Sequence, residues 1–142
     1  MRAAVFQTEG QPLTVEDRQM PVAQSGDIVM KVAYCGICGS DLHATEPSPT
    51  PLGAGTVLGH EFAGIVSQSA SDAFAPGDRV IGLPLRECAE CRHTGTGCKD
   101  GLGIYCPKNK IIGLAPDVPG GYAEYLAMPA HYAMKVPDGL DL

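Results

Sequence analysis

Frequent glycine and proline residues limit what this chain can fold into. The 142 residues include eighteen glycines and twelve prolines, which favour turns and short strands over a helical bundle. The length corresponds to one domain with a core of its own. A composition of 44% hydrophobic and 18% charged residues is ordinary for a globular protein. We therefore expect one mainly β domain with many turns.

Short segments separated by turns indicate six or more strands, one of them with clear alternation of polarity. The clearest spans 27–34, where Ile28, Met30 and Val32 share one face. Further strands are expected at 2–7, 13–18, 61–68, 79–82, 120–128 and 132–136. Many short strands with little helix predict a β-barrel or sandwich.

The charge and the N-terminus exclude several classes of partner. The net charge is −6 and the basic residues are scattered, which argues against nucleic acid binding. We find no apolar run long enough to cross a membrane. Gln7 and Glu9 come too early for the apolar core of a signal peptide. We expect a reducing cytoplasm, where the six cysteines are metal ligands or catalytic groups rather than disulfides.

The stretch 87–106 is dense in cysteine and glycine and lacks apolar periodicity, so it cannot build a hydrophobic core of its own. A tetrahedral zinc with four thiolates would replace that core and leave no position for substrate, which makes the expected role structural. The alternative is a group of loop cysteines without metal, which would be open to oxidation. His93 is a further candidate ligand that we assign to the surface. The four expected ligands are Cys88, Cys91, Cys98 and Cys106.

A second, less regular set of metal-binding residue types is formed by Cys38, His60 and Glu61. A catalytic zinc takes about three protein ligands and keeps a position open for water or substrate. The alternative for His60 is a hydrogen-bonded core histidine. Cys35 and Cys38 also form a C-x2-C pair, but a redox motif of this type leads into a long helix. We assign Cys35 as a small buried residue at a strand end.

The residues that follow Cys38 provide a hydroxyl and an imidazole. Ser40 suits a helix N-cap, so 41–44 are expected to form one helical turn. His43 follows Ser40 by three residues, and the two together offer a proton path.

Four motifs of this chain resemble, in type and order, those of the N-terminal, GroES-like catalytic domain of the zinc-dependent medium-chain alcohol dehydrogenases. The resemblance covers nearly the whole chain. The motifs are a first zinc-ligand motif at 35–43, a G-H-E-x-x-G signature at 59–64, a G-D-x-V turn at 76–80, and the strand after the structural-zinc lobe at 120–125. The fold that this resemblance implies is a partly open, GroES-like β-barrel with short helices and a zinc-binding lobe.

The resemblance also implies roles for individual residues. Cys38 and His60 match the ligands of the catalytic zinc, and Glu61 matches a carboxylate that binds it in some members of the family. The lobe cysteines match the structural-zinc quartet, although the middle gap is six residues here and usually two. Ser40 matches the hydroxyl that hydrogen-bonds the substrate oxygen, and His43 matches the residue that passes the proton to solvent. Asp41 matches a partner that orients His60.

The family also needs parts that residues 1–142 do not contain. These are a Rossmann-type domain for NAD or NADP and a further zinc ligand. We therefore interpret 1–142 as the catalytic domain of a longer enzyme that oxidises a small alcohol or polyol to an aldehyde or ketone. The fragment alone should be inactive, and its exposed face could favour dimers. The alternatives are a stand-alone zinc-binding GroES-like interaction domain without enzymatic activity, and a related reductase whose inner zinc site is vestigial.

Overall fold

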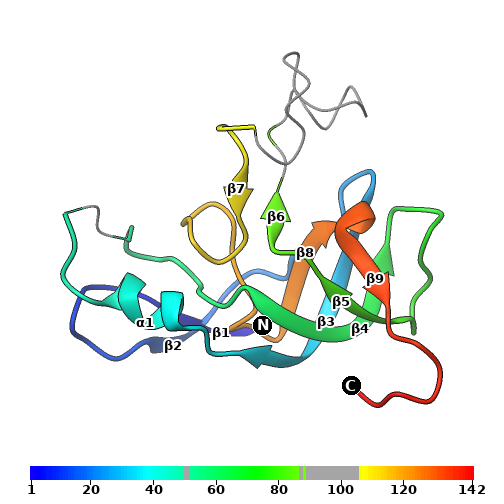
Figure 1. Cartoon of the computed structure of the whole chain (residues 1–142), viewed down its shortest axis with the longest axis horizontal. Coiled ribbons are helices and arrows are strands. Elements are labelled where there is room, and N and C mark those ends of the chain that lie inside the picture. Colours follow the sequence, from blue (N-terminus) through cyan, green and yellow to red (C-terminus); the bar gives the residue numbers. More distant parts are fainter. Residues whose placement is uncertain (50–51, 87, 89–105) are drawn as a thin grey trace.

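A computed structural model describes residues 1–49, 52–86, 88 and 106–142, and Figure 1 shows the arrangement of its elements. Most of these elements are short strands, and there is one α-helix among the described residues. In chain order they are β1 (Arg2–Val5), β2 (Thr14–Asp17), β3 (Asp27–Gly36), α1 (Gly39–Thr45), β4 (Glu61–Ser69), β5 (Arg79–Gly82), β6 (Leu85–Arg86), β7 (Lys110–Ile111), β8 (Tyr125–Pro129), a 3-10 helix (Ala130–Tyr132) and β9 (Ala133–Lys135).

The main sheet has five antiparallel strands in the order β8-β3-β4-β5-β9. Its longest strand, β3, pairs with β8 through its first half and with β4 along nearly its whole length. The β3–β4 register pairs Gly36, at the end of β3, with Glu61, at the start of β4. Segments that are distant in sequence therefore meet at this end of the sheet.

The hydrophobic core lies against this sheet. Its buried members come from every strand of the sheet except β9, from the 3-10 helix and from the segment 112–118. Among them are Ile28, Met30, Val66, Val80 and Met128. A smaller cluster of Ala3, Val5 and Val57 packs under the β1–β2 hairpin.

The sheets described here do not close on one another, and this agrees with the expected mainly β, partly open GroES-like barrel. The short pair β6–β7 forms a separate two-stranded sheet, and Leu85 of β6 packs against the hydrophobic core. No helix in the described ranges is both long and apolar enough to cross a membrane.

Most of the expected strands are present, and four details differ. The strand expected at 120–128 begins only at Tyr125, because residues 120–122 hydrogen-bond to the 57–59 backbone rather than to a neighbouring strand of the sheet. The segment 132–136 starts within a 3-10 helix and gives only a three-residue strand. The helix is longer than the turn expected at 41–44, and its N-cap is Cys38, not Ser40. The strands β6 and β7 were not expected, since each has only two residues.

Candidate metal centre

The pairing of β3 with β4 explains how Cys38 meets His60 and Glu61. Cys38 follows the end of β3 and caps α1, while His60 and Glu61 stand at the start of β4. Because the two strands are antiparallel and Gly36 pairs with Glu61, the end of one strand lies beside the start of the other. Cys38 and His60, which are 22 positions apart in the sequence, are therefore brought together by strand pairing.

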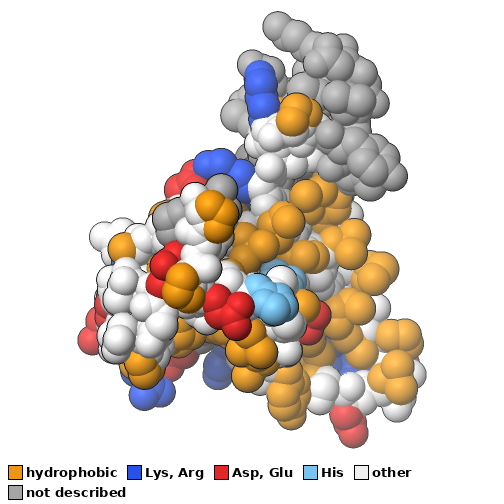
Figure 2. All heavy atoms as spheres, turned by 60° about the vertical axis from the view of Figure 1, so that its left-hand side comes forward, with side chains coloured by type: hydrophobic (Ala, Val, Ile, Leu, Met, Phe, Trp, Pro, Cys, Tyr) orange, Lys and Arg blue, Asp and Glu red, His pale blue; other side chains and the backbone are white. Residues whose placement is uncertain are grey.

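One potential ligand atom from each of Cys38, His60 and Glu61 lies within 4.8 Å of the other two. Cys38 and His60 are partly buried, whereas Glu61 is exposed. The carboxylate of Glu61 lies over Gly36, where a Cβ atom would come within 2.5 Å of its Oε2. Figure 2, which turns the α1 side of the molecule forward, shows histidine side chains next to acidic ones on this surface.

This donor set suits zinc, which binds thiolate, imidazole and carboxylate groups. The orientation of His60 is consistent with a role as a zinc ligand. Its Nδ1 atom is buried and makes no well-aligned hydrogen bond within the described residues. The nearest carboxylate oxygen, Oδ1 of Asp41, lies 3.3 Å away. A proton on Nδ1 directed to Asp41 would leave the lone pair of Nε2 for a metal ion.

Asp41 is a buried carboxylate at the centre of this arrangement, with only 3% of its surface exposed. Its Oδ2 accepts hydrogen bonds from the Cys38 N–H at 2.9 Å and from the Tyr122 hydroxyl at 3.0 Å. Its Oδ1 accepts one from the Gly59 N–H at 3.3 Å. Buried charges require such partners, so Asp41 connects the start of α1 to the segment before β4.

The two residues of the expected proton path have different surroundings. The hydroxyl oxygen of Ser40 lies 3.0 Å from Nε2 of His60, so Ser40 is at the candidate centre. His43 is one turn further along α1, where its side chain is 79% exposed and its Nδ1 lies 3.2 Å from Glu46. Ser40 therefore faces the ligands, and His43 faces solvent.

The bend before His60 is fixed by contacts that leave no room for a side chain. Gly59 has a φ angle of 92°, and a Cβ atom there would lie 2.6 Å from the ring of Tyr122 and 2.7 Å from the sulfur of Cys35. The backbone N–H groups of Gly121 and Tyr122 donate hydrogen bonds to the carbonyls of Gly59 and Leu58 at 2.7 and 2.9 Å. The ligand-bearing segment is thus held against 121–122.

Cys35 is not part of the ligand cluster. It is partly buried at the end of β3, and burial raises the pKa of its thiol to about 11. A thiol with such a pKa is protonated at neutral pH and is a poor nucleophile. This state fits the assignment of Cys35 as a packing residue and argues against a redox role for the C-x2-C pair.

Only part of the cysteine-rich stretch can be compared with the expected structural zinc site. The sulfurs of Cys88 and Cys106 lie 3.9 Å apart, and Cys106 is buried. The Cys88 N–H donates a hydrogen bond to the side chain of Asn109 at 3.1 Å. Cys91, Cys98 and His93 lie outside the described residues. The two described cysteines are therefore close together, as convergence on one ion requires.

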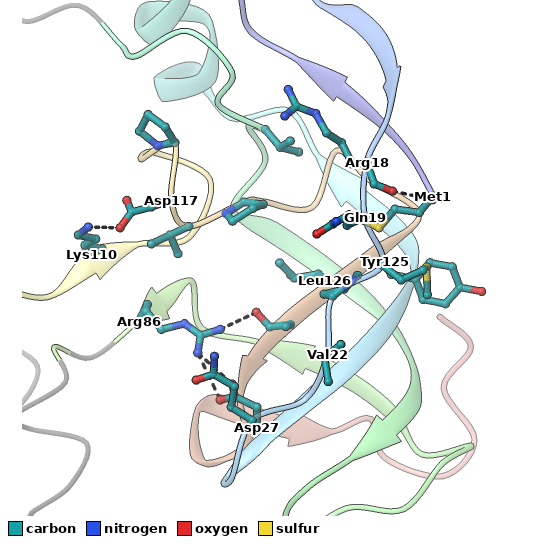
Figure 3. Close-up of a pocket in the computed structure, with 18 of the residues that line it drawn as sticks. Met1, Arg18, Gln19, Val22, Asp27, Arg86, Lys110, Asp117, Tyr125 and Leu126 are labelled. Atoms are coloured by element: carbon teal, nitrogen blue, oxygen red, sulfur yellow. Dashed lines mark hydrogen bonds and ion pairs between the residues drawn. The ribbon is translucent and has the colours of Figure 1, made fainter.

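A cavity of about 1150 Å³ lies elsewhere in the described residues, and none of Cys38, His60 and Glu61 lines it. Its wall includes charged side chains that are already paired (Figure 3). The Nη1 atom of Arg86 lies 3.1 Å from the buried Asp27, and Lys110 pairs with Asp117. The cavity is therefore separate from the candidate metal centre.

Sequence reasoning missed the part of Tyr122 in this centre. The segment 120–125 stands out in the sequence for its glycines, but nothing there indicates that a tyrosine hydroxyl would reach a carboxylate 81 positions earlier. The contact depends on how the chain returns to the bend at Gly59, and no local pattern encodes that return.

The fold and the donor set together define a mainly β domain with a candidate zinc centre at the end of its main sheet. A family model described as the alcohol dehydrogenase GroES-like domain matches residues 24–138. The chain belongs to this family.

Known relatives extend this assignment. The chain is 38% identical to zinc-type alcohol dehydrogenase B of Aspergillus flavus and 36% identical to an alcohol dehydrogenase of Geobacillus stearothermophilus, and each alignment covers 99% of the chain. These alignments cover 32% and 41% of the two relatives, so the chain spans less than half their length. A crystal structure of an NAD-dependent alcohol dehydrogenase superposes with a TM-score of 0.81 at 28% identity, over 99% of this chain and 41% of the other.

Proposed function

We propose that residues 1–142 are the catalytic domain of a zinc-dependent dehydrogenase that oxidises a small alcohol or polyol to an aldehyde or ketone. The observation that carries this proposal is the convergence of Cys38, His60 and Glu61 within 4.8 Å of one another, with the Ser40 hydroxyl beside them. The family membership and the names of the relatives support it. NAD or NADP would supply the hydride acceptor from a part of the longer protein outside these residues.

Cys38 and His60 are the proposed protein ligands, and Glu61 is the candidate third. A zinc ion held by such a set acts as a Lewis acid toward an alcohol oxygen and lowers its pKa. The thiolate and the imidazole would be held by the α1 cap and the start of β4, which are paired through the sheet. Glu61 is exposed and lies over Gly36, so it has room to move toward or away from the ion.

Ser40 is the proposed acceptor of the alcohol proton. The Nε2 atom of a neutral imidazole has one lone pair, so it cannot bind a metal and accept a hydrogen bond from Ser40 at once. With Nε2 used as a ligand atom, the Ser40 hydroxyl, which lies 3.0 Å away, would be free to accept the alcohol proton while it gives up its own proton toward His43. His43 would pass the proton on, since its ring is largely exposed to water.

The cysteine-rich stretch is the proposed structural zinc site, with Cys88, Cys91, Cys98 and Cys106 as ligands. The 3.9 Å separation of the Cys88 and Cys106 sulfurs supports it. Four protein ligands would leave no position for substrate, so this ion would hold the stretch together and take no part in the reaction.

Metal analysis of matched cysteine variants tests the proposal. We expect the chain, purified under reducing conditions without chelators and reconstituted with zinc, to hold two zinc ions. Cys38→Ala should lose the ion of the candidate centre, and Cys35→Ala, three residues earlier and outside the ligand cluster, should keep both. Equal zinc content in the parent and Cys38→Ala chains, or equal losses in the two variants, would remove Cys38 from a metal site and with it the proposed function.

A further inference from the structure

Tyr122 connects the segment after the cysteine-rich stretch directly to the candidate centre. Its hydroxyl donates to Oδ2 of Asp41 at 3.0 Å and also lies 3.2 Å from the carbonyl oxygen of Gly36. Its ring packs against Gly59, and its backbone N–H donates to the Leu58 carbonyl at 2.9 Å. The ring and backbone contacts fix the position of the tyrosine, so its hydroxyl is held against the buried carboxylate.

The two oxygens of Asp41 have separate tasks. Oδ2 is held by the Cys38 N–H and by the Tyr122 hydroxyl. Oδ1 receives the Gly59 N–H and lies 3.3 Å from Nδ1 of His60. Because both donors to Oδ2 are anchored, the plane of the carboxylate cannot turn freely, and Oδ1 stays beside the imidazole.

We propose that Tyr122 is a positioning residue of the metal centre. Its hydroxyl holds the Asp41 carboxylate so that Oδ1 keeps the proton of His60 on Nδ1 and leaves Nε2 as the ligand atom. The inference rests on the proposed zinc-dependent function, and it adds to that function a residue that touches none of the three candidate ligand atoms in the described structure.

Tyr122→Phe isolates the hydroxyl. Phenylalanine keeps the ring that packs against Gly59, and it removes only the donor to Asp41. The carboxylate would keep the Cys38 and Gly59 N–H groups, but with one donor fewer its Oδ1 would be held less firmly beside His60. Loss of a partner behind a metal ligand lowers metal affinity by about 10–100-fold. Tyr122 acts one residue further away, so we expect a loss of about tenfold, at the lower end of that range.

Cobalt(II) affinity provides the first readout. Titration of the chain with cobalt(II), monitored by the thiolate-to-cobalt absorption, reports on both proposed sites. The same titration of Cys38→Ala gives the absorption change that belongs to the cysteine-rich stretch. The Cys38-dependent part should weaken about tenfold in Tyr122→Phe. It should not change in Tyr125→Phe, which removes a tyrosine hydroxyl from β8, outside the ligand cluster.

The tautomer of His60 provides a second readout that needs no metal. In the metal-free chain, nitrogen-15 spectra of the neutral His60 ring should show its proton on Nδ1. In Tyr122→Phe the two tautomers should both be populated. A change confined to packing would not move this signal.

A double-mutant cycle with Asp41→Asn decides whether Tyr122 acts through Asp41. Coupled residues give non-additive effects, so Tyr122→Phe should weaken cobalt binding little or not at all once Asp41 is replaced. An equal loss in both backgrounds, or an unchanged affinity and tautomer in Tyr122→Phe, overturns the inference. Absence of any Cys38-dependent cobalt binding in the parent refutes the proposed function instead, and the His60 tautomer then still decides the role of Tyr122.

Discussion

Replacing Gly59 by alanine separates two demands that the structure makes just before His60. The first is conformational, because φ is 92° and only glycine adopts this region without strain. The second is steric, because a Cβ atom would lie 2.7 Å from the Cys35 sulfur and 2.6 Å from a ring carbon of Tyr122. Real Cβ atoms essentially never come this close to other heavy atoms, so neighbouring groups would have to move.

Gly77 is a matched control for the conformational part. Its φ angle is 97°, nearly that of Gly59, but nothing lies within 4 Å of the Cβ position. A non-glycine residue in this region costs about 1–2 kcal/mol. Overpacking of a tight site costs a further ~1–3 kcal/mol. Gly77→Ala should therefore lower the free energy of unfolding by about 1–2 kcal/mol, and Gly59→Ala by about 2–5 kcal/mol.

Urea unfolding followed by circular dichroism measures both values by linear extrapolation. The variants should also differ in metal binding. Gly59→Ala displaces the segment that bears His60 and Glu61, so Cys38-dependent cobalt(II) affinity should fall in that variant and stay at the parent level in Gly77→Ala.

The steric part can be partly reversed. In the double variant Cys35→Ala, Gly59→Ala, the sulfur that a new Cβ atom would meet is absent, so part of the lost stability should return, while the contact with the Tyr122 ring remains. The reasoning is refuted if Gly59→Ala and Gly77→Ala destabilise the chain equally, or if removal of the Cys35 sulfur from Gly59→Ala restores nothing.

Two further substitutions test the base of the cysteine-rich stretch and the proposed reaction. Arg86→Met removes the cation that pairs with Asp27, which is only 1% exposed, and should lower the free energy of unfolding by about 3–5 kcal/mol. The control Lys110→Met removes an exposed ion pair and should change that free energy by about 0–1 kcal/mol. Equal urea midpoints for the two variants would contradict this prediction. Ser40→Ala in the complete enzyme should slow alcohol oxidation by about two to four orders of magnitude with unchanged zinc content, and an unchanged rate would exclude Ser40 from proton transfer.

The elements that could be predicted from the sequence are those with a local signal. The segment 27–34 alternates in polarity and 61–68 is apolar with two β-branched residues, Ile65 and Val66, and the strands β3 and β4 were found close to these bounds. The signals failed where tertiary contacts decide. Gly120 and Gly121 look like the start of a strand, but their N–H groups bond to the carbonyls of Val57 and Gly59 instead. The pair β6–β7 is too short to show any periodicity.

The helix cap shows how local reasoning can choose the wrong residue. Ser40 is a good N-cap by residue type, but Cys38 has the extended backbone of a cap, with φ and ψ of −83° and 154°. Asp41 then falls at the third helical position, where its carboxylate accepts the Cys38 N–H as in a capping box. The carboxylate that completes the cap is the same one that faces His60.

The distance in sequence between the residues of the candidate site explains which of them could be predicted from the sequence. Cys38, His60 and Glu61 could be proposed as a group from residue type alone, because few side chains bind zinc. Their convergence required the β3–β4 register, which a period-2 pattern suggests but does not fix. The link from Tyr122 to Asp41 spans 81 positions and has no counterpart in any local pattern.

The contacts around the candidate centre are made by groups of the protein itself. Gly59 is held by the backbone of 121–122 and by the Cys35 and Tyr122 side chains. Asp41 is held by N–H groups on both ligand-bearing segments. These contacts position the three candidate ligands through the backbone and neighbouring side chains. The stretch 87–106 is the opposite case, because its sequence offers no core and its stability would have to come from a bound ion. Under the proposed function, the fold would thus position the ligands of one site, and an ion would stabilise the segment that bears the other.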